Sequence, residues 1–200
     1  MYLVSHFAPG KSILWHAAAS SVSIAGIQLS VADGASKVLA TARQDEKCEF
    51  AVKELGATAA FNTKTSNWVD EVMKATDGQG VDIIIDFIGA DYFQQNLDAL
   101  ARDGVIVNLG MMGGIKLKEG TDISAFIRKR ATFRGSSLRS RDEAYQGKLR
   151  DQLVEHALPR FRDGRFKVWV DKVMPWEKIQ EAQRLLEENK TKGKVICTVG

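Results

Sequence analysis

Cysteine and proline are scarce in this chain, which has two cysteines and three prolines among its 200 residues. Cys48 and Cys197 lie far apart in the sequence, and neither stands at the spacing of a metal-binding motif. The cysteines therefore predict no metal site. We expect both to be reduced thiols in a protein of the cytoplasm.

Long hydrophobic runs and a strong charge excess are also absent. No signal peptide opens the sequence, and no apolar run approaches the ~20 residues of a membrane-spanning helix. We therefore expect no membrane partner. The net charge is +3, and the only dense basic stretch covers residues 128–141. We interpret that stretch as a solvated face and expect no nucleic-acid partner.

Glycine is missing from the turn where a dinucleotide-binding unit would use it. Residues 12–16 read as a short buried strand and residues 22–33 as a helix with an apolar face. In such units, glycines in the turn let a pyrophosphate approach the helix N-terminus. Here the turn holds Ser20 and Ser21, with Ser23 close behind. Taken alone, it fits a phosphate cradle and a purely structural helix start equally well.

Strand-like and helical segments alternate through residue 136. This alternation predicts an α/β fold, a doubly wound parallel sheet with ligands at the carboxyl ends of its strands. The segment 81–87 has the β-branched run of a central buried strand. We expect strands at 12–16, 37–42, 58–62, 81–87, 105–109 and 131–136, and helices at 22–33, 45–55, 68–76 and 92–100.

The alternation stops after residue 142. We expect a long helix from 144 to about 158, whose end is marked by Pro159 with Asp163-Gly164-Arg165. A strand at 168–170, a helix from Pro175 to about 188 and a last strand at 194–199 follow. These elements look like part of a second domain whose other strands lie outside the chain. The predicted division is therefore 8–160 and 161–200. Residues 1–7 look like the end of a helix that begins upstream.

Basic residues follow the second predicted strand. Arg43 and Lys47 lie where an NAD site places an acidic residue for the ribose hydroxyls. A guanidinium and an ammonium suit a 2′-phosphate, which favours NADP(H) over NAD(H). The alternative is that both are solvated charges at a helix start. The missing acidic residue also counts against an S-adenosylmethionine methyltransferase.

No catalytic constellation emerges from the sequence. Tyr145 and Lys148 are one residue too close for the Tyr–Lys pair of short-chain dehydrogenases, and the three histidines have no ligand spacing. We expect His16, at the end of the first strand, to be a hydrogen-bonded core residue. The prediction therefore names no catalytic residue and no metal ligand.

Several segments together resemble a known family. They are His16-Ala17-Ala18-Ala19-Ser20-Ser21-Val22-Ser23 with Ile27-Gln28-Leu29, then Glu54-Leu55-Gly56-Ala57, Asp86-Phe87-Ile88-Gly89, Gly110-Met111-Met112-Gly113-Gly114, Ser137-Leu138-Arg139-Ser140-Arg141-Asp142 and Gly193-Lys194-Val195. In combination they are similar to the zinc-independent quinone oxidoreductases of the medium-chain dehydrogenase/reductase superfamily. The motif at 137–142 is especially similar to the tumour-suppressor-inducible branch.

The resemblance implies a Rossmann-like domain that binds NADP(H). The implied contacts are Ala19, Ser20, Ser21, Val22 and Ser23 at the pyrophosphate, Arg43 and Lys47 at the 2′-phosphate, Thr63 beside the adenosine, Ile88, Gly89, Gly110, Met111 and Met112 along the nicotinamide ribose and amide, Ser137, Leu138 and Arg139 near the nicotinamide, and Lys194 near the phosphates. Ser21 and Ser23 replace glycines that the family normally keeps.

The chemistry implied by the resemblance is hydride transfer from NADPH to a quinone or another activated acceptor, without zinc. The family's N-terminal GroES-like half, which supplies most of the substrate pocket, is missing, and 161–200 would be the C-terminal segment of that truncated domain. The alternative is a non-catalytic or degenerate Rossmann module with weak or no NADP(H) binding. A homodimer through the sheet edge at 131–136 is a further expectation.

Overall fold

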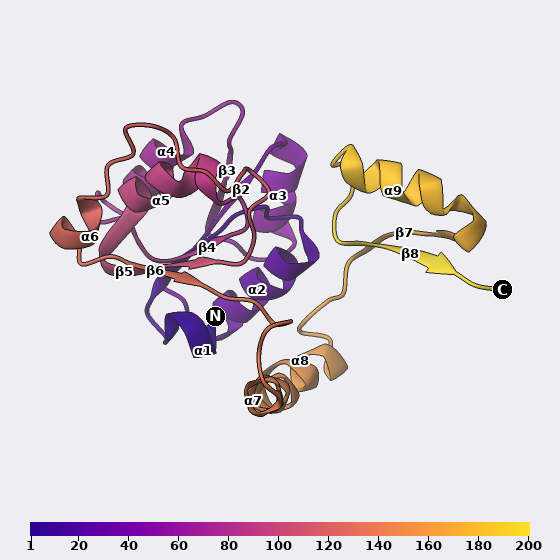
Figure 1. The fold of residues 1–200 in the computed structure, drawn as a ribbon. Helices are drawn as coiled ribbons and strands as arrows, with labels where there is room; N and C mark the ends of the chain where they lie inside the picture. The colour runs from indigo at the N-terminus through magenta and orange to yellow at the C-terminus, as the bar shows by residue number, and fades with distance from the viewer.

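Six parallel strands form the central sheet of the molecule, a computed structural model that describes all of residues 1–200. Their order is β3-β2-β1-β4-β5-β6 (Figure 1). The order reverses between β1 and β4, where a crevice opens at the carboxyl ends of the strands. The strands are β1 (Ser12–Trp15), β2 (Lys37–Ala42), β3 (Ala59–Asn62), β4 (Val81–Asp86), β5 (Leu100–Asn108) and β6 (Thr132–Gly135).

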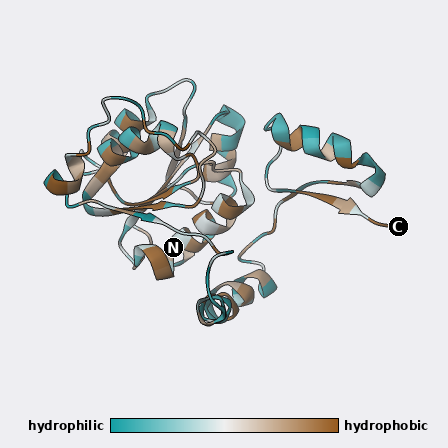
Figure 2. Ribbon diagram, viewed as in Figure 1, coloured by the Kyte–Doolittle hydropathy of each residue, from teal (hydrophilic) through white to brown (hydrophobic).

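Helices cover both faces of this sheet. The helical elements are α1 (Tyr2–Ser5), α2 (Ser21–Ala32), α3 (Asp45–Lys53), α4 (Trp68–Ala75), the 3-10 turn Ala90–Tyr92, α5 (Phe93–Ala99) and α6 (Ala125–Arg128). Alternate residues of β1 face opposite ways, so Ile13 and Trp15 pack with α2 and α3, whereas Leu14 packs with α4 and α5. Figure 2 shows hydrophobic residues along the central strands. The result is a three-layer α/β core.

Helix α2 lies unusually close to the sheet because Gly26 faces Trp15. A Cβ placed on Gly26 would lie 2.1 Å from the Trp15 ring. The Trp15 indole N–H also donates to the hydroxyl of Ser30 at 3.1 Å. This contact fixes α2 against β1 and so sets the position of the helix N-terminus at the end of that strand.

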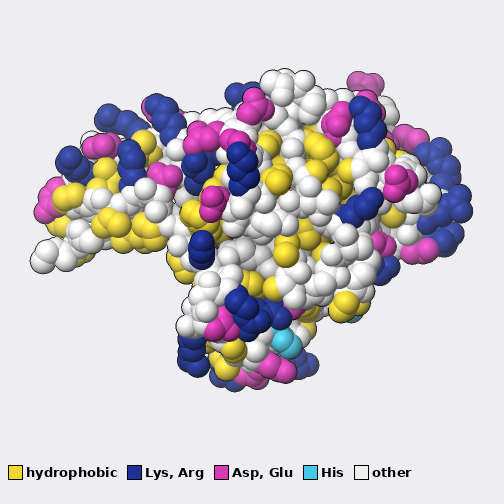
Figure 3. Space-filling view, turned by 180° about the vertical axis from the view of Figure 1, so that it is seen from behind, with side chains coloured by type: hydrophobic (Ala, Val, Ile, Leu, Met, Phe, Trp, Pro, Cys, Tyr) yellow, Lys and Arg dark blue, Asp and Glu magenta, His cyan; other side chains and the backbone are white.

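The last third of the chain forms a long helix and a small separate sheet. These elements are α7 (Glu143–Gln152), a π-helical turn (Leu153–Ala157), α8 (Leu158–Arg162), β7 (Val170–Pro175), the 3-10 turn Trp176–Lys178, α9 (Ile179–Glu187) and β8 (Lys194–Thr198). Strands β7 and β8 pair in parallel. With α9 they extend to one side of the main sheet (Figure 1), and hydrophobic side chains line one edge of this arm in Figure 3. None of the helices combines the length and apolar character needed to cross a membrane.

The predicted fold class is confirmed, with two corrections after residue 142. Helix does not end at Pro159, because the π-turn shifts the hydrogen-bond register and places this proline in the first turn of α8. The strand predicted at 168–170 is wrong, because only Val170 of that segment belongs to β7, which continues to Pro175 alongside β8. Cys48 and Cys197 form no disulfide.

Candidate functional site

A cleft of about 910 Å³ opens at the carboxyl ends of β1, β2 and β4. Its position is the crevice expected of a doubly wound sheet, and its size is that of a small-molecule site. One wall comes from the sheet and α3, and the opposite wall comes from the segment after α9. The lining includes Ala17, Ala18, Ala19, Ser20, Ser21, Thr41, Ala42, Arg43, Lys47, Thr63, Ile88, Asp91, Tyr92, Met112, Gly113, Leu186, Asn189, Thr191, Gly193, Lys194 and Val195.

The turn between β1 and α2 holds unpaired main-chain donors, and two of the residues that contribute them, Ala19 and Ser21, line the cleft. No acceptor within the protein receives the N–H groups of Ala19, Ser21 and Val22. The first N–H groups of a helix have no partner within the helix and carry its positive dipole end. The turn requires a left-handed residue only at Ala17, where φ is 52°. Its serines therefore cause no backbone strain.

The hydroxyl groups of two of the serines form hydrogen bonds within the protein. Ser20 caps α2, since its hydroxyl oxygen accepts from the Ser23 N–H at 3.2 Å. Its hydroxyl donates to the Ser23 hydroxyl at 3.0 Å, which in turn donates to the His16 carbonyl at 2.7 Å. Ser23 is fully buried, so its side chain does not reach the cleft. Only the Ser21 hydroxyl has no partner within the protein.

His16 lies beneath the cleft as a buried, hydrogen-bonded residue, as its position in the sequence predicts. Its Nε2 donates to the side-chain oxygen of Asn96 at 2.8 Å, and its Nδ1 accepts from the Thr41 hydroxyl at 2.7 Å. Burial lowers the pKa of His16, although the Asn96 bond and the carboxylate of Asp86 act in the opposite direction. A neutral imidazole therefore supports Thr41, which lines the cleft.

The buried carboxylate of Asp86 joins the loops that follow β4 and β5. It accepts from the N–H groups of Ile88 at 2.7 Å and Gly89 at 3.1 Å, and from the side-chain amide of Asn108 at 3.0 Å. The Asn108 amide also donates to the carbonyl of Gly110 at 2.9 Å. Three donors thereby meet one carboxylate, and the Asn108 amide links it to Gly110 in the loop after β5.

Gly89 allows these two loops to lie against each other. Its φ is 83°, and a Cβ there would lie 3.0 Å from both the Gly114 carbonyl oxygen and the Met111 Cα. Main-chain bonds from Met112 to Phe87 at 3.1 Å and from Gly113 to Ile88 at 2.7 Å continue the contact. The far end of the cleft is therefore built from closely apposed backbone.

Arg43 directly follows β2, whereas Lys47 lies in the first turn of α3, and the two side chains differ in their surroundings. The Arg43 side chain is exposed, whereas Lys47 is 5% exposed. The Lys47 ammonium donates to the main-chain and side-chain oxygens of Asn189, both at 2.7 Å. Burial lowers the pKa of Lys47, and the carboxylates of Asp171 and Glu46 oppose that change. Both residues line the cleft.

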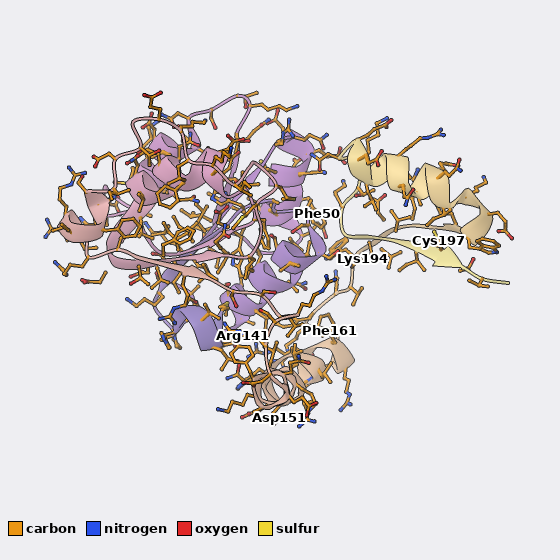
Figure 4. The ribbon with its side chains drawn as sticks, viewed as in Figure 1. Phe50, Arg141, Asp151, Phe161, Lys194 and Cys197 are labelled. Atoms are coloured by element: carbon orange, nitrogen blue, oxygen red, sulfur yellow. The ribbon has the colours of Figure 1, made fainter.

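The segment after α9 closes one side of the cleft. The Gly193 N–H donates to the Ala19 carbonyl at 2.9 Å, which ties this segment to the turn before α2. Lys194 begins β8 and lies between the main sheet and the arm (Figure 4). The Trp169 ring packs edge-on against Phe50 of α3, with 4.8 Å between centroids. The C-terminal segment is thus part of the site.

The residues implied by the family resemblance fall into three groups. In the main cleft lie Ala19, Ser20, Ser21, Arg43, Lys47, Thr63, Ile88, Met112 and Lys194. A second hollow of about 470 Å³ is lined by Gly110, Met111 and Ser137, together with Asn108 and Arg141. Neither hollow is lined by Val22, Ser23, Gly89, Leu138 or Arg139. The two hollows adjoin at the loop 110–112.

Sequence reasoning missed several lining residues. Thr41 and Tyr92 gave no signal of their own, and Asn189 is brought to Lys47 only by the tertiary fold. Asp86 belongs to the segment 86–89 that resembles the family, but the sequence does not indicate that its carboxylate accepts hydrogen bonds from Ile88, Gly89 and Asn108. No group of three or more His, Cys, Asp or Glu side chains is arranged to hold a metal ion.

The arrangement fits a dinucleotide. A pyrophosphate at the N-terminus of α2 would meet the free N–H groups of Ala19, Ser21 and Val22. Arg43 and Lys47 lie toward one end of the cleft, and the glycine-rich backbone after β4 and β5 forms the other. These features together define a candidate cofactor-binding site.

Comparison with known proteins supports this assignment. Residues 21–154 match the family described as zinc-binding dehydrogenase. Quinone oxidoreductase-like protein 2 of Bos taurus is 28% identical over 198 residues, which is 96% of this chain and 54% of that protein. The chain thus spans about half the length of this curated relative.

Solved structures give the same result. A crystal structure of an NAD-dependent alcohol dehydrogenase is 32% identical with a TM-score of 0.80, covering 96% of this chain and 52% of that one. The CurK enoyl reductase is 30% identical with a TM-score of 0.80, covering 100% of this chain and 58% of that one. The chain belongs to the zinc-binding dehydrogenase family and is a quinone oxidoreductase-like, cofactor-binding portion of the medium-chain dehydrogenase/reductase superfamily.

Proposed function

We propose that this chain binds NADP(H) and forms the cofactor-binding half of an oxidoreductase that transfers hydride from NADPH to a quinone or another activated acceptor, without zinc. The observation that carries the proposal is the set of free N–H groups at the N-terminus of α2, contributed by Ala19, Ser21 and Val22. Ala19 and Ser21 line a cleft that Arg43 and Lys47 also line. This combination suits a pyrophosphate and a second phosphate on the ribose.

The preference for NADP(H) rests on the end of β2. No carboxylate there is placed to accept hydrogen bonds from a ribose diol, and neither Arg43 nor Lys47 forms an ion pair. Two cations without a carboxylate partner would attract a 2′-phosphate. The similar alcohol dehydrogenase is described as NAD-dependent, so fold similarity alone does not decide between the cofactors.

At the other end of the cleft, the chain's contribution would be positioning. The bound cofactor supplies the hydride, and the loops that carry Ile88 and Met112 would orient its nicotinamide. Asp86 holds these loops together. The acceptor would enter beside the loop 110–112, where the second hollow begins. Quinones and conjugated alkenes both accept hydride, and the names of the similar proteins include both chemistries.

One observation favours a second candidate, a module with weak or no cofactor binding. The hydroxyls of Ser20 and Ser23 are used within the protein, and Ser21 places a side chain where the family normally keeps glycine. The two candidates differ in a simple titration. NADPH binding that is tighter than NADH binding supports the oxidoreductase, and no binding of either supports the degenerate module.

A variant pair on α3 sharpens this titration. We expect Lys47→Ala to weaken NADPH binding about tenfold or more, because it removes a charged hydrogen-bond donor, while NADH binding changes little. Lys53→Ala is the matched control, since Lys53 lies on the same helix and pairs with Glu49 at the surface. Equal effects of both substitutions on NADPH would contradict the proposed role of Lys47.

Further proposals concern the whole protein. The β7–β8 pair exposes apolar surface at Val170, Val173 and Ile196. This surface supports a division at 160/161 and a GroES-like partner domain for 161–200.

Strand β6 is an exposed sheet edge, so a homodimer is expected to form through it. Light scattering of the purified chain tests the dimer. The expected cytoplasmic location stays a prediction.

A further inference from the structure

The ammonium of Lys47 is held by a residue from a distant part of the chain. Asn189 follows α9 and contacts Lys47 across 142 positions of sequence. Its main-chain oxygen and its side-chain oxygen both accept from Lys47 Nζ at 2.7 Å. Two acceptors on one residue fix the nitrogen at a defined point, whereas a free lysine would move among many rotamers.

The backbone around Asn189 is built for this contact. Asn189 has a φ of 54°, in the left-handed region that asparagine tolerates better than most residues. Its N–H donates to the Leu186 carbonyl at 3.0 Å, which closes the end of α9. Lys192 pairs with Glu46, and Gly193 bonds to Ala19. The loop is therefore attached to both α3 and the turn before α2.

Both acceptors on Asn189 are neutral, and Lys47 forms no ion pair. The two carboxylates whose charge acts on Lys47 bond elsewhere: Glu46 pairs with the Lys192 side chain, and Asp171 accepts from the Lys192 N–H at 3.0 Å. An ammonium has three N–H donors, and Asn189 takes two of them. One donor remains for a ligand in the cleft, which Arg43 also lines.

We propose that Asn189 is a positioning residue for recognition of the cofactor's 2′-phosphate: it holds Lys47 so that its remaining donor faces the cleft. This rests on the proposed NADP(H) function. The C-terminal segment then sets cofactor preference together with α3. If the contact only attached the segment after α9 to α3, its loss would weaken NADPH binding and NADH binding to the same extent.

Two substitutions of Asn189 test the proposal. Asn189→Gly keeps the left-handed backbone and the main-chain acceptor but removes the side-chain acceptor. Asn189→Asp keeps the size and shape of the side chain and places a carboxylate beside the Lys47 ammonium. Lys190→Ala is the control, because Lys190 is the next residue and pairs with Glu188 at the surface. Dissociation constants for NADPH and NADH are measured by calorimetry on the full chain, with melting temperatures alongside.

We expect Asn189→Asp to lower the ratio of NADPH to NADH affinity about tenfold or more, since it neutralises a charge that the phosphate needs. Asn189→Gly should lower the ratio by a smaller factor, and Lys190→Ala should leave it unchanged. The NADH dissociation constant should stay nearly constant throughout.

Each other outcome has a distinct meaning. If Lys47→Ala lowers the ratio of NADPH to NADH affinity but neither Asn189 variant does, the proposed function stands and the role of Asn189 is refuted. If NADPH and NADH affinities fall in parallel in Asn189→Gly, the contact only attaches the C-terminal segment, which also refutes it. If the unaltered chain binds neither nucleotide, the proposed function itself fails, and this inference fails with it.

Discussion

The carboxylate of Asp86, at the end of β4, accepts a hydrogen bond at 3.0 Å from the side-chain amide of Asn108, at the end of β5. Both side chains are buried. Their contact joins the two neighbouring strand ends from which the cleft's glycine-rich loops start. It therefore couples the stability of the sheet to the shape of the site.

The first prediction concerns this carboxylate. We expect Asp86→Asn to destabilise the fold by about 1–3 kcal/mol, because the new amide brings N–H donors toward N–H donors of Ile88, Gly89 and Asn108. Urea unfolding measures the change. Asp98→Asn, at an exposed position on α5, is the control. Equal stability of Asp86→Asn and the unaltered chain would show that Asp86 does not hold the loops.

The second prediction separates two serines of the phosphate turn. We expect Ser21→Gly to tighten NADPH binding, since it removes an unpaired side chain at the helix N-terminus and lets a phosphate come closer. Ser23→Gly should cost about 2 kcal/mol of stability, because it loses the buried bond to His16 and adds a glycine to a helix. Calorimetric titration and urea unfolding of each variant check the two effects. Weaker NADPH binding by Ser21→Gly would mean that its hydroxyl contacts the ligand.

The third prediction is a pH dependence caused by His16. Burial lowers the pKa of His16 in the folded protein. At pH values between that lowered pKa and the ordinary value of about 6.5, His16 is protonated in the unfolded chain but neutral in the folded one. Stability should therefore fall as pH drops below about 6.5, by up to about 1.4 kcal/mol per pH unit from this group. The free energy of unfolding of His16→Gln should fall less steeply between about pH 7 and pH 5. His6→Gln is the exposed control, and equal slopes in all three proteins would contradict the prediction.

The fourth prediction tests the close packing of α2 on β1. A methyl group at Gly26 would overlap the Trp15 ring, so Gly26→Ala should destabilise the protein by about 1–3 kcal/mol or more. Gly147→Ala is the matched control, because Gly147 lies in α7 with open space around it and alanine is the better helix former. Thermal unfolding of both variants gives the comparison. A stabilised Gly26→Ala would mean that α2 is not held against Trp15.

The main sheet could be predicted from the sequence because its signals are local. The run at 81–87 and the helix after residue 44 carry their own patterns, and the observed and predicted boundaries of these two elements differ by a residue or two. The strand predicted at 105–109 is too short, because β5 begins at Leu100. Arg43 and Lys47 were placed together because they flank the start of one helix. Such predictions depend only on residues that lie close together in the sequence.

The remaining features depend on contacts between distant segments. The pairing of Lys47 with Asn189 requires α3 and the end of α9 to meet, and no local pattern indicates this. The strand at 168–170 was misplaced because β7 owes its extent to pairing with β8 rather than to its own composition. The family resemblance predicts that Ser23 contacts the pyrophosphate, whereas its hydroxyl donates to the main-chain carbonyl of His16.

The proposed function requires that this chain binds NADP(H) at the cleft above β1 and β2 and prefers it to NAD(H). The most direct measurement is a pair of calorimetric titrations of the purified chain, one with NADPH and one with NADH, at the same ionic strength. We predict that NADPH binds about tenfold tighter or more, and that Lys47→Ala removes most of this difference. Equal or tighter binding of NADH would contradict the claim.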